Sequence, residues 1–119
     1  FNSAYEYIIV FSNDQPNKRK FYDTTFKGTQ QNVFTLKNKH SNPFADVHKA
    51  IMPLDVPRYL MQIFGNKNDI WYDPYSGTGT SAVAAIQEEK IFLGSEIFKD
   101  YVELSYKRLE PYLTQTRLF

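Results

Sequence analysis

Cysteine is absent from this chain of 119 residues, which excludes disulfide bonds and thiolate metal sites. The two histidines, His40 and His48, cannot form a zinc site unaided. No apolar run reaches the roughly 18 residues of a membrane-spanning helix, and the first residues lack the charged and apolar regions of a signal peptide. We therefore expect a soluble cytoplasmic protein that holds no metal ion.

Aromatic residues, in contrast, are abundant. They make up 17% of the chain, with 10 Phe and 9 Tyr. This content supplies enough apolar area for a folded core and argues against a disordered tail. The length allows one small domain at most.

A glycine turn occupies residues 73–80, which read Asp-Pro-Tyr-Ser-Gly-Thr-Gly-Thr between the apolar run 69–72 and the helix-forming run 81–86. Glycine permits a tight turn and carries no Cβ, so backbone N–H groups can approach a ligand at the start of the following helix. A side chain at Gly77 or Gly79 would occupy ligand space. The segment predicts a loop that binds a nucleotide-type cofactor.

Glu96 lies where a second apolar run, residues 90–94, ends. An acidic residue at the tip of the second strand, roughly 20 residues after the glycine loop, is placed to accept hydrogen bonds from both ribose hydroxyls. We expect Glu96 to bind ribose, although a carboxylate at a strand end is more often exposed and without function. Asp73 is similarly open to two readings, because it either orders the loop near the cofactor or only caps the turn.

The pattern of apolar residues predicts an α/β fold. Strands are expected at residues 5–11, 32–36, 69–73 and 90–96, and helices at 56–64, 79–88 and 98–110. Residues 69–110 should form a β-α-β-α unit with parallel strands.

Two of the expected helices have a predicted buried side. For the helix at 56–64 this side comprises Val56, Tyr59, Leu60, Ile63 and Phe64, with Pro57 near the start and Gly65 past the end. For the last helix it comprises Phe98, Tyr101, Val102, Leu109 and Leu113, and Pro111 should disturb the helix end.

Three further segments accompany the glycine loop in a recognisable order. Residues 5–12 read Tyr-Glu-Tyr-Ile-Ile-Val-Phe-Ser, residues 48–57 read His-Lys-Ala-Ile-Met-Pro-Leu-Asp-Val-Pro, and residues 92–97 read Phe-Leu-Gly-Ser-Glu-Ile, followed by Tyr101 and Lys107-Arg108-Leu109. With Asp-Pro-Tyr-Ser-Gly-Thr-Gly-Thr, which is similar to a motif I of the form Asp-Pro-Phe-x-Gly-x-Gly-Thr, this arrangement resembles the S-adenosylmethionine-dependent DNA methyltransferases of the N6-adenine/N4-cytosine type.

The resemblance implies a Rossmann-like, three-layer αβα methyltransferase fold, here with an incomplete parallel sheet plus N-terminal strands. Residues 1–12 would hold the N-terminal strand, 13–47 a DNA-recognition segment, and 48–119 the cofactor-binding β-α-β-α unit. It further implies that the cofactor S-adenosyl-L-methionine is bound by Asp73, Pro74, Tyr75, Ser76, Gly77, Thr78, Gly79, Thr80, Glu96, Ile97, His48, Ala50 and Met52. Ile97 and Phe98 would flank the adenine ring. His48 is equally open to a structural role, because Lys49 replaces the proline that follows it in the family.

The family's catalytic motif, Asp/Asn/Ser-Pro-Pro-Tyr/Phe/Trp, is missing, since the chain contains no Pro-Pro dipeptide. In that motif the polar side chain holds the exocyclic amine of a flipped base on which the aromatic ring stacks. Asn42-Pro43-Phe44 is a near match that reads as a plain turn. We therefore expect no catalytic residue here, a chain that lacks its catalytic half, and no methyl transfer by the chain alone.

Basic residues gather in residues 13–48, and the aromatic residues Phe21, Tyr22, Phe26 and Phe34 are interleaved with them. This composition suits a surface that meets a phosphate backbone, and it coincides with the family's target-recognition segment. The expected DNA contacts are Lys18, Arg19, Lys20, Lys37 and Lys39. The alternative is a solvated loop region.

Two other functions remain open at this stage. The spacing of Gly77, Gly79 and Ala82 also fits the G-x-G-x-x-G/A pattern of dinucleotide-dependent oxidoreductases. A non-catalytic DNA-binding accessory module is the third possibility. In the family's sheet the strand at 69–73 also pairs with the strand that carries the catalytic motif. Because that second neighbour is absent here, we expect self-association, rearrangement of the strand at 5–11 to cover the gap, or pairing with a catalytic half.

Overall fold

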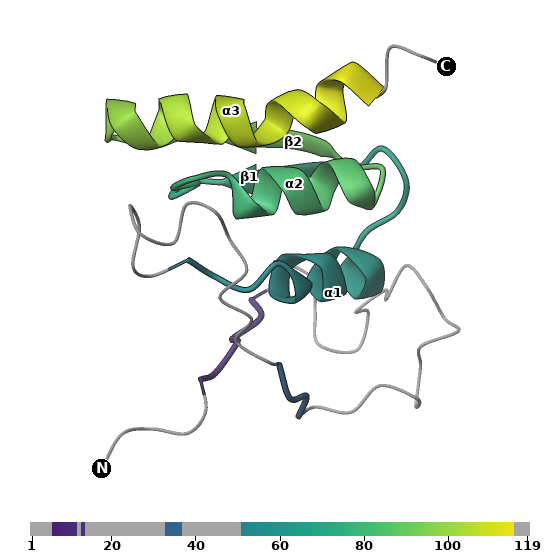
Figure 1. Ribbon diagram of the computed structural model, residues 1–119. Coiled ribbons are helices and arrows are strands. Elements are labelled where there is room, and N and C mark those ends of the chain that lie inside the picture. Colours follow the sequence, from purple (N-terminus) through teal and green to yellow (C-terminus); the bar gives the residue numbers. More distant parts are fainter. Residues whose placement is uncertain (1–5, 12, 14–32, 37–50, 116–119) are drawn as a thin grey trace.

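The computed structural model describes residues 6–11, 13, 33–36 and 51–115. In order, its elements are α1 (Asp55–Phe64), β1 (Ile70–Asp73), α2 (Thr80–Gln87), β2 (Ile91–Gly94) and α3 (Lys99–Gln115) (Figure 1). The predicted β-α-β-α unit is thereby confirmed, with each strand and α2 shorter than expected at one or both ends.

The two strands pair in parallel, with Ile70 opposite Ile91 and Asp73 opposite Gly94. Helix α2 makes the crossover that parallel strands require. Because both strands run in the same direction, their carboxyl ends meet at one edge of the sheet. That edge carries the loop after Asp73 and the segment after Gly94.

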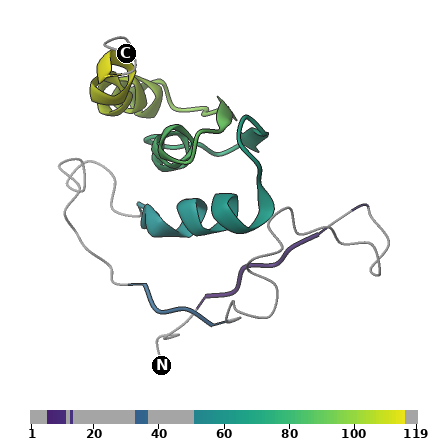
Figure 2. The same ribbon diagram turned by 90° about the vertical axis from the view of Figure 1, so that its right-hand side faces the viewer.

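The helices lie on one side of the sheet in both ribbon views (Figure 2). Trp71 of β1 and Phe92 of β2 pack toward a core formed by Met61 of α1 with Ala84 and Ala85 of α2. Side chains of a strand alternate between its two faces, so Tyr72 and Leu93 lie on the opposite face, where they are 63% and 54% exposed. Within the described residues, the chain thus forms two of the three expected layers.

Helix α1 begins and ends where its sequence signals predict. Pro57 lies in the first turn, and the N–H of Gly65, at the C-cap, donates to the carbonyl of Met61. The most buried residues are Pro57, Met61 and Ile63, whereas only Ile63 of these was in the predicted apolar face. The helix is therefore rotated relative to the prediction, because Met61 fills the space against α2 and Trp71.

Helix α2 is the central element of the core. Ala82, Val83, Ala84 and Ala85 are all 3% exposed or less. Their small side chains allow α2 to lie between α1 and α3 and against β2 at the same time. Arg58 of α1 further links to Glu88 at the end of α2, with Nε 2.8 Å from Oε1.

Helix α3 differs from the prediction in two ways. It continues through Pro111 to Gln115, so the expected disturbance at Pro111 does not end it. Phe98 and Leu113 are 63% and 52% exposed, so their assignment to the buried side was wrong. Pro111 has no N–H and so removes one helical hydrogen bond, but on this exposed stretch water can bind the carbonyl that is left without a donor.

The strands predicted at 5–11 and 32–36 are not formed in the described parts of these segments, residues 6–11 and 33–36. Strand propensity alone does not make a strand, because its backbone groups need a hydrogen-bonded neighbour. Instead, the ring of Phe34 packs on that of Tyr59 on α1, with 4.5 Å between the ring centroids. Among the described helices, none has the length and apolar character needed to cross a bilayer.

Candidate functional site

The loop from β1 to α2 is built on Asp73, the last residue of β1. Its Oδ1 accepts a hydrogen bond from the Tyr75 N–H at 2.9 Å, which is an Asx turn, and its Oδ2 accepts one from the Ser81 hydroxyl at 2.6 Å. Asp73 therefore joins the first residues of the loop to the first turn of α2. The capping role considered for Asp73 is present in the structure.

The two loop glycines have left-handed backbone angles, with φ of 50° at Gly77 and 84° at Gly79. The N–H of Gly79 donates to the Ser76 carbonyl at 2.8 Å and closes the turn. Gly79 is also the N-cap of α2, and no side-chain cap bond is made there. The first N–H groups of a helix have no acceptor within the helix, so the loop delivers them to this edge of the sheet.

Glu96 lies directly against the glycine turn. Its Oε2 accepts a hydrogen bond from the Gly77 N–H at 2.9 Å, and its Oε1 accepts one from the Phe98 N–H at 2.9 Å. Two backbone bonds between the loops, Ser95 N–H to Asp73 carbonyl and Ser76 N–H to Ser95 carbonyl, both 3.0 Å, fix this approach. The structure thus brings together the loop and the acidic residue that the sequence placed in one site.

The loop has an exposed side and a buried side. Tyr75 and Ile97 are 87% and 90% exposed, whereas Thr78 and Thr80 are 2% and 6% exposed. A Cβ added at Gly79 would lie 3.0 Å from Cβ of Ser105 on α3. The space that Gly79 preserves is therefore occupied by α3, which corrects the expectation that a side chain there would enter ligand space.

Other predicted site residues lie before α1 or outside the described residues. Met52, before α1, is 40% exposed. His48 and Ala50 lie outside the described residues, as do the expected DNA contacts Lys18, Arg19, Lys20, Lys37 and Lys39. The described part of the chain contains no cluster of three side chains suited to a metal ion.

Sequence reasoning missed two side chains that hold the loop, Ser81 and Arg108. Ser81 binds Asp73, and Nη1 of Arg108 donates to Oγ1 of Thr80 at 2.9 Å. Ser81 is the second residue of α2, where a hydroxyl could have been matched to the aspartate. Arg108 carried no local signal, because it lies 28 residues from its partner.

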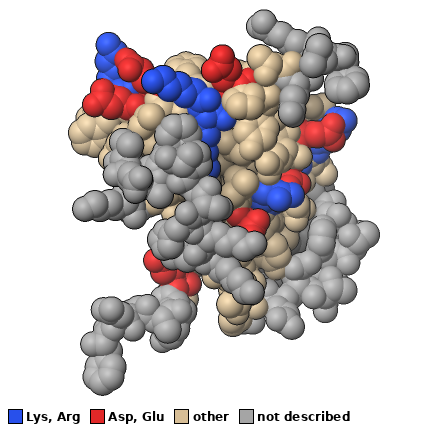
Figure 3. Space-filling model, in the orientation of Figure 1, with Lys and Arg blue, Asp and Glu red and all other residues tan. Residues whose placement is uncertain are grey.

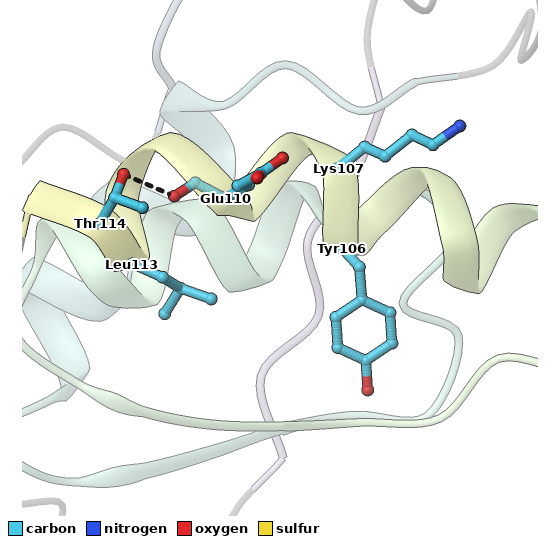
Figure 4. Close-up of a pocket in the computed structure, with 5 residues that line it drawn as sticks. All are labelled: Tyr106, Lys107, Glu110, Leu113 and Thr114. Carbon is cyan, nitrogen blue, oxygen red and sulfur yellow. Dashed lines mark hydrogen bonds between the residues drawn. The ribbon is translucent and has the colours of Figure 1, made fainter.

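A separate shallow hollow runs along α3 and is lined by Tyr106, Lys107, Glu110, Leu113 and Thr114 (Figure 4). Tyr106 and Leu113 extend from the same side of the helix in this view. All five residues belong to α3 itself, and none comes from the loop or from the segment around Glu96. The hollow is therefore not part of the site at the strand ends.

Residues 1–107 match the family model described as DNA methylase, N6_N4_Mtase. Among similar proteins, the type II beta methyltransferase M.BslI of Bacillus sp. (strain NEB-606) is 36% identical over 116 residues, which is 89% of this chain and 12% of that protein. The orphan methyltransferase M.BamHII of Bacillus amyloliquefaciens is 30% identical over 90 residues, or 72% of this chain and 34% of that protein. The chain thus spans about a third or less of these relatives.

Among solved structures, the M1.HpyAVI-SAM complex superimposes with a TM-score of 0.50 and 35% identity. The match covers 52% of this chain and 30% of M1.HpyAVI.

Proposed function

Because the chain belongs to the family of N6-adenine and N4-cytosine DNA methyltransferases, we propose that residues 73–80 and Glu96 bind S-adenosylmethionine for methylation of a DNA base. The observation that carries the proposal is the 2.9 Å hydrogen bond from the Gly77 N–H to Glu96 Oε2, which brings a carboxylate to the glycine turn. In this proposal residues 48–119 form the cofactor-binding unit, with His48, Ala50 and Met52 beside the methionine end.

The residues present suit this cofactor. Each carboxylate oxygen can accept about two hydrogen bonds. Oε1 and Oε2 of Glu96 each accept one from the backbone, so each retains an acceptor position for a ribose hydroxyl. The exposed side chains of Tyr75, Ile97 and Phe98 flank the same edge and offer apolar surface for an adenine ring.

The contribution of these residues to catalysis is orientation. When bound, the cofactor supplies an electrophilic methyl group for the exocyclic amine of the base. Glu96 and the loop N–H groups fix the ribose and the direction of the methyl group, and such positioning accounts for a large share of the barrier reduction in two-substrate reactions. Both carboxylate oxygens of Asp73 accept hydrogen bonds, one from Tyr75 and one from Ser81, and we propose that Asp73 maintains the shape of the loop.

No Pro-Pro dipeptide occurs in this chain, and we propose that the base-holding motif is supplied by a catalytic half. Among the described residues β1 pairs only with β2, which leaves its other edge available to a further strand. We propose that a catalytic half, or a second copy of the chain, pairs at this edge.

Calorimetry of S-adenosylmethionine binding tests the site. Glu96→Ala should weaken binding by roughly 1.5–3 kcal/mol, the scale of a hydrogen bond to a charged group. Glu96→Gln, which keeps one acceptor oxygen and can still accept from the Gly77 N–H, should lose less. The matched control is Glu89→Ala, because Glu89 is an exposed acid that pairs with Lys67 instead. Unchanged affinity of Glu96→Ala removes Glu96 from the site, and tighter binding of NAD than of S-adenosylmethionine would favour a dinucleotide oxidoreductase.

For DNA, we propose contacts through Lys18, Arg19, Lys20, Lys37 and Lys39, on the basis of composition and family position. On the face shown in Figure 3, the described acidic and basic side chains alternate, and no broad basic surface is visible among them.

The salt dependence of DNA binding tests that assignment. Replacing Lys18, Arg19 and Lys20 together by alanine should flatten the slope of log affinity against log salt by up to about three units. The control triple variant Lys67→Ala, Lys99→Ala, Lys107→Ala changes the net charge equally and should leave the slope unchanged. Equal effects of the two triple variants would show that only net charge matters.

A further inference from the structure

Helix α3 packs against the buried side of the glycine loop. Gly79 lies so close to it that a Cβ at this position would be 3.0 Å from Cβ of Ser105 and 3.5 Å from its Cα. Thr78 and Thr80, on either side of Gly79, are almost completely buried. The buried side of the loop therefore takes its shape from contacts with α3.

One side chain of α3 bonds directly to this buried side. Nη1 of Arg108 donates to Thr80 Oγ1 at 2.9 Å and approaches the Thr78 carbonyl oxygen at 3.4 Å. The shorter contact is a well-formed hydrogen bond, and the longer one is near the limit for one. Together they span Gly79, whose φ of 84° is a left-handed angle that glycine adopts without strain.

The charge of Arg108 is not explained by an ion pair. Within the described residues, the three salt bridges join other side chains, and none includes Arg108. Burial lowers the pKa of this half-buried guanidinium, which reflects a cost of keeping the charge there. Burying a charge costs free energy unless hydrogen bonds compensate for it, and for Arg108 the contacts with the loop supply that compensation.

The charge of Arg108 does not stabilise α2 through the helix dipole. Thr80 is the first residue of α2, and a cation at a helix N-terminus opposes the helix dipole. Arg108 also places a positive charge on the buried side of the loop, whereas the carboxylate of Glu96 lies on the other side. Helix α3 also reaches the front of the site, because the Phe98 N–H, just before the helix, donates to Glu96 Oε1.

We propose that Arg108 is a positioning residue for the cofactor loop: it holds Thr78, Gly79 and Thr80 in the conformation in which the Gly77 N–H orients Glu96 toward the ligand. Its effect on ligand affinity rests on the proposed binding of S-adenosylmethionine. Its effect on the loop itself does not, and can be measured in the ligand-free chain.

Amide hydrogen exchange of the full chain is the primary test. The reporter is the Gly79 N–H, bonded to the Ser76 carbonyl, and the reference is the Gly65 N–H, bonded to Met61 at the end of α1. Arg108→Met should speed exchange at Gly79 relative to Gly65 by about tenfold or more, the scale of one lost charge-assisted hydrogen bond. Thr80→Val, which removes the acceptor and keeps the shape, should act in the same direction.

The control is Arg58→Met, which removes a partly exposed arginine that links α1 to Glu88 at the opposite end of α2. It should not speed Gly79 exchange relative to Gly65. Equal acceleration at Gly79 and Gly65 in Arg108→Met would make Arg108 a general stabiliser of the fold and overturn the proposal, as would unchanged exchange at Gly79.

Affinity for S-adenosylmethionine provides the second readout. Arg108→Met should weaken binding by about tenfold, and Arg108→Lys should restore it to within about threefold, because a single nitrogen makes both contacts. If the unaltered chain binds no S-adenosylmethionine while Gly79 exchange still responds to Arg108, the proposed function fails and the positioning role stands. Unaltered affinity in Arg108→Met would contradict the positioning role.

Discussion

Replacing Gly79 by alanine tests how strongly the packing of α3 constrains the loop. At φ of 84° a residue with a Cβ is strained, which costs about 1–2 kcal/mol. The new Cβ would also lie 3.0 Å from Ser105 Cβ, and overpacking of this kind costs about 1–3 kcal/mol. The free energy of unfolding should therefore fall by about 2–5 kcal/mol, a large part of the roughly 5–15 kcal/mol of a typical domain.

Urea denaturation of the full chain, followed by circular dichroism, measures this loss. With a slope of about 1.5 kcal/mol per molar urea, the midpoint should fall by about 1–3 M. The double variant Gly79→Ala, Ser105→Gly removes the clash but not the backbone strain, so it should show a favourable coupling of about 1 kcal/mol or more. An unchanged midpoint for Gly79→Ala would refute the strain argument, and additive effects in the double variant would refute the packing argument.

Three further predictions concern the core, a surface ion pair and the assembly. Met61→Ala, at a position 2% exposed, should lower the free energy of unfolding by about 2–5 kcal/mol, whereas Leu113→Ala on the exposed side of α3 should change it by under about 1 kcal/mol, as judged by urea midpoints. The hydrogen bond from Lys67 lowers the pKa of the Glu89 carboxyl, so the pair stabilises the fold above the ordinary carboxyl pKa and less as the pH falls through the lowered one. Lys67→Met should raise that pKa in an NMR titration, and a constant pKa would contradict the pairing. The isolated chain should transfer no labelled methyl group to DNA and should self-associate in sedimentation, because β1 has an open edge in the described structure; a monomer that methylates DNA would contradict this.

The elements around the site could be predicted from local sequence patterns. The turn chemistry of Asp73, Gly77 and Gly79 depends on neighbouring residues, and the apolar runs on either side have the lengths of a buried strand and helix. The distance between the loop and Glu96 also follows from a β-α-β unit, because parallel strands end at the same edge. The proximity of Glu96 to the glycine loop could therefore be predicted from the sequence, whereas the hydrogen bond from the Gly77 N–H to Glu96 is a finding of the structure.

Features that depend on distant partners could not be predicted in this way. Residues 6–11 and 33–36 have strand composition, but a strand forms only where another strand accepts its hydrogen bonds. Leu113 and Phe98 have the spacing that places them on the apolar side of the predicted helix. Which side of α3 is covered, however, depends on where α2 lies. Arg108 contacts Thr80 across 28 residues, a separation at which sequence carries no pairing signal.

We propose that S-adenosylmethionine binds where the loop after β1 meets Glu96. An amide NMR titration of the full chain with S-adenosylmethionine, compared with NAD, measures this binding most directly. Binding at this site should give saturable shifts at Ser76, Gly77, Glu96 and Ile97, with weaker binding of NAD and no response at Leu113 or Thr114 in the hollow of α3. Shifts confined to α3, or no shift at Gly77 and Glu96 under saturating S-adenosylmethionine, would contradict it.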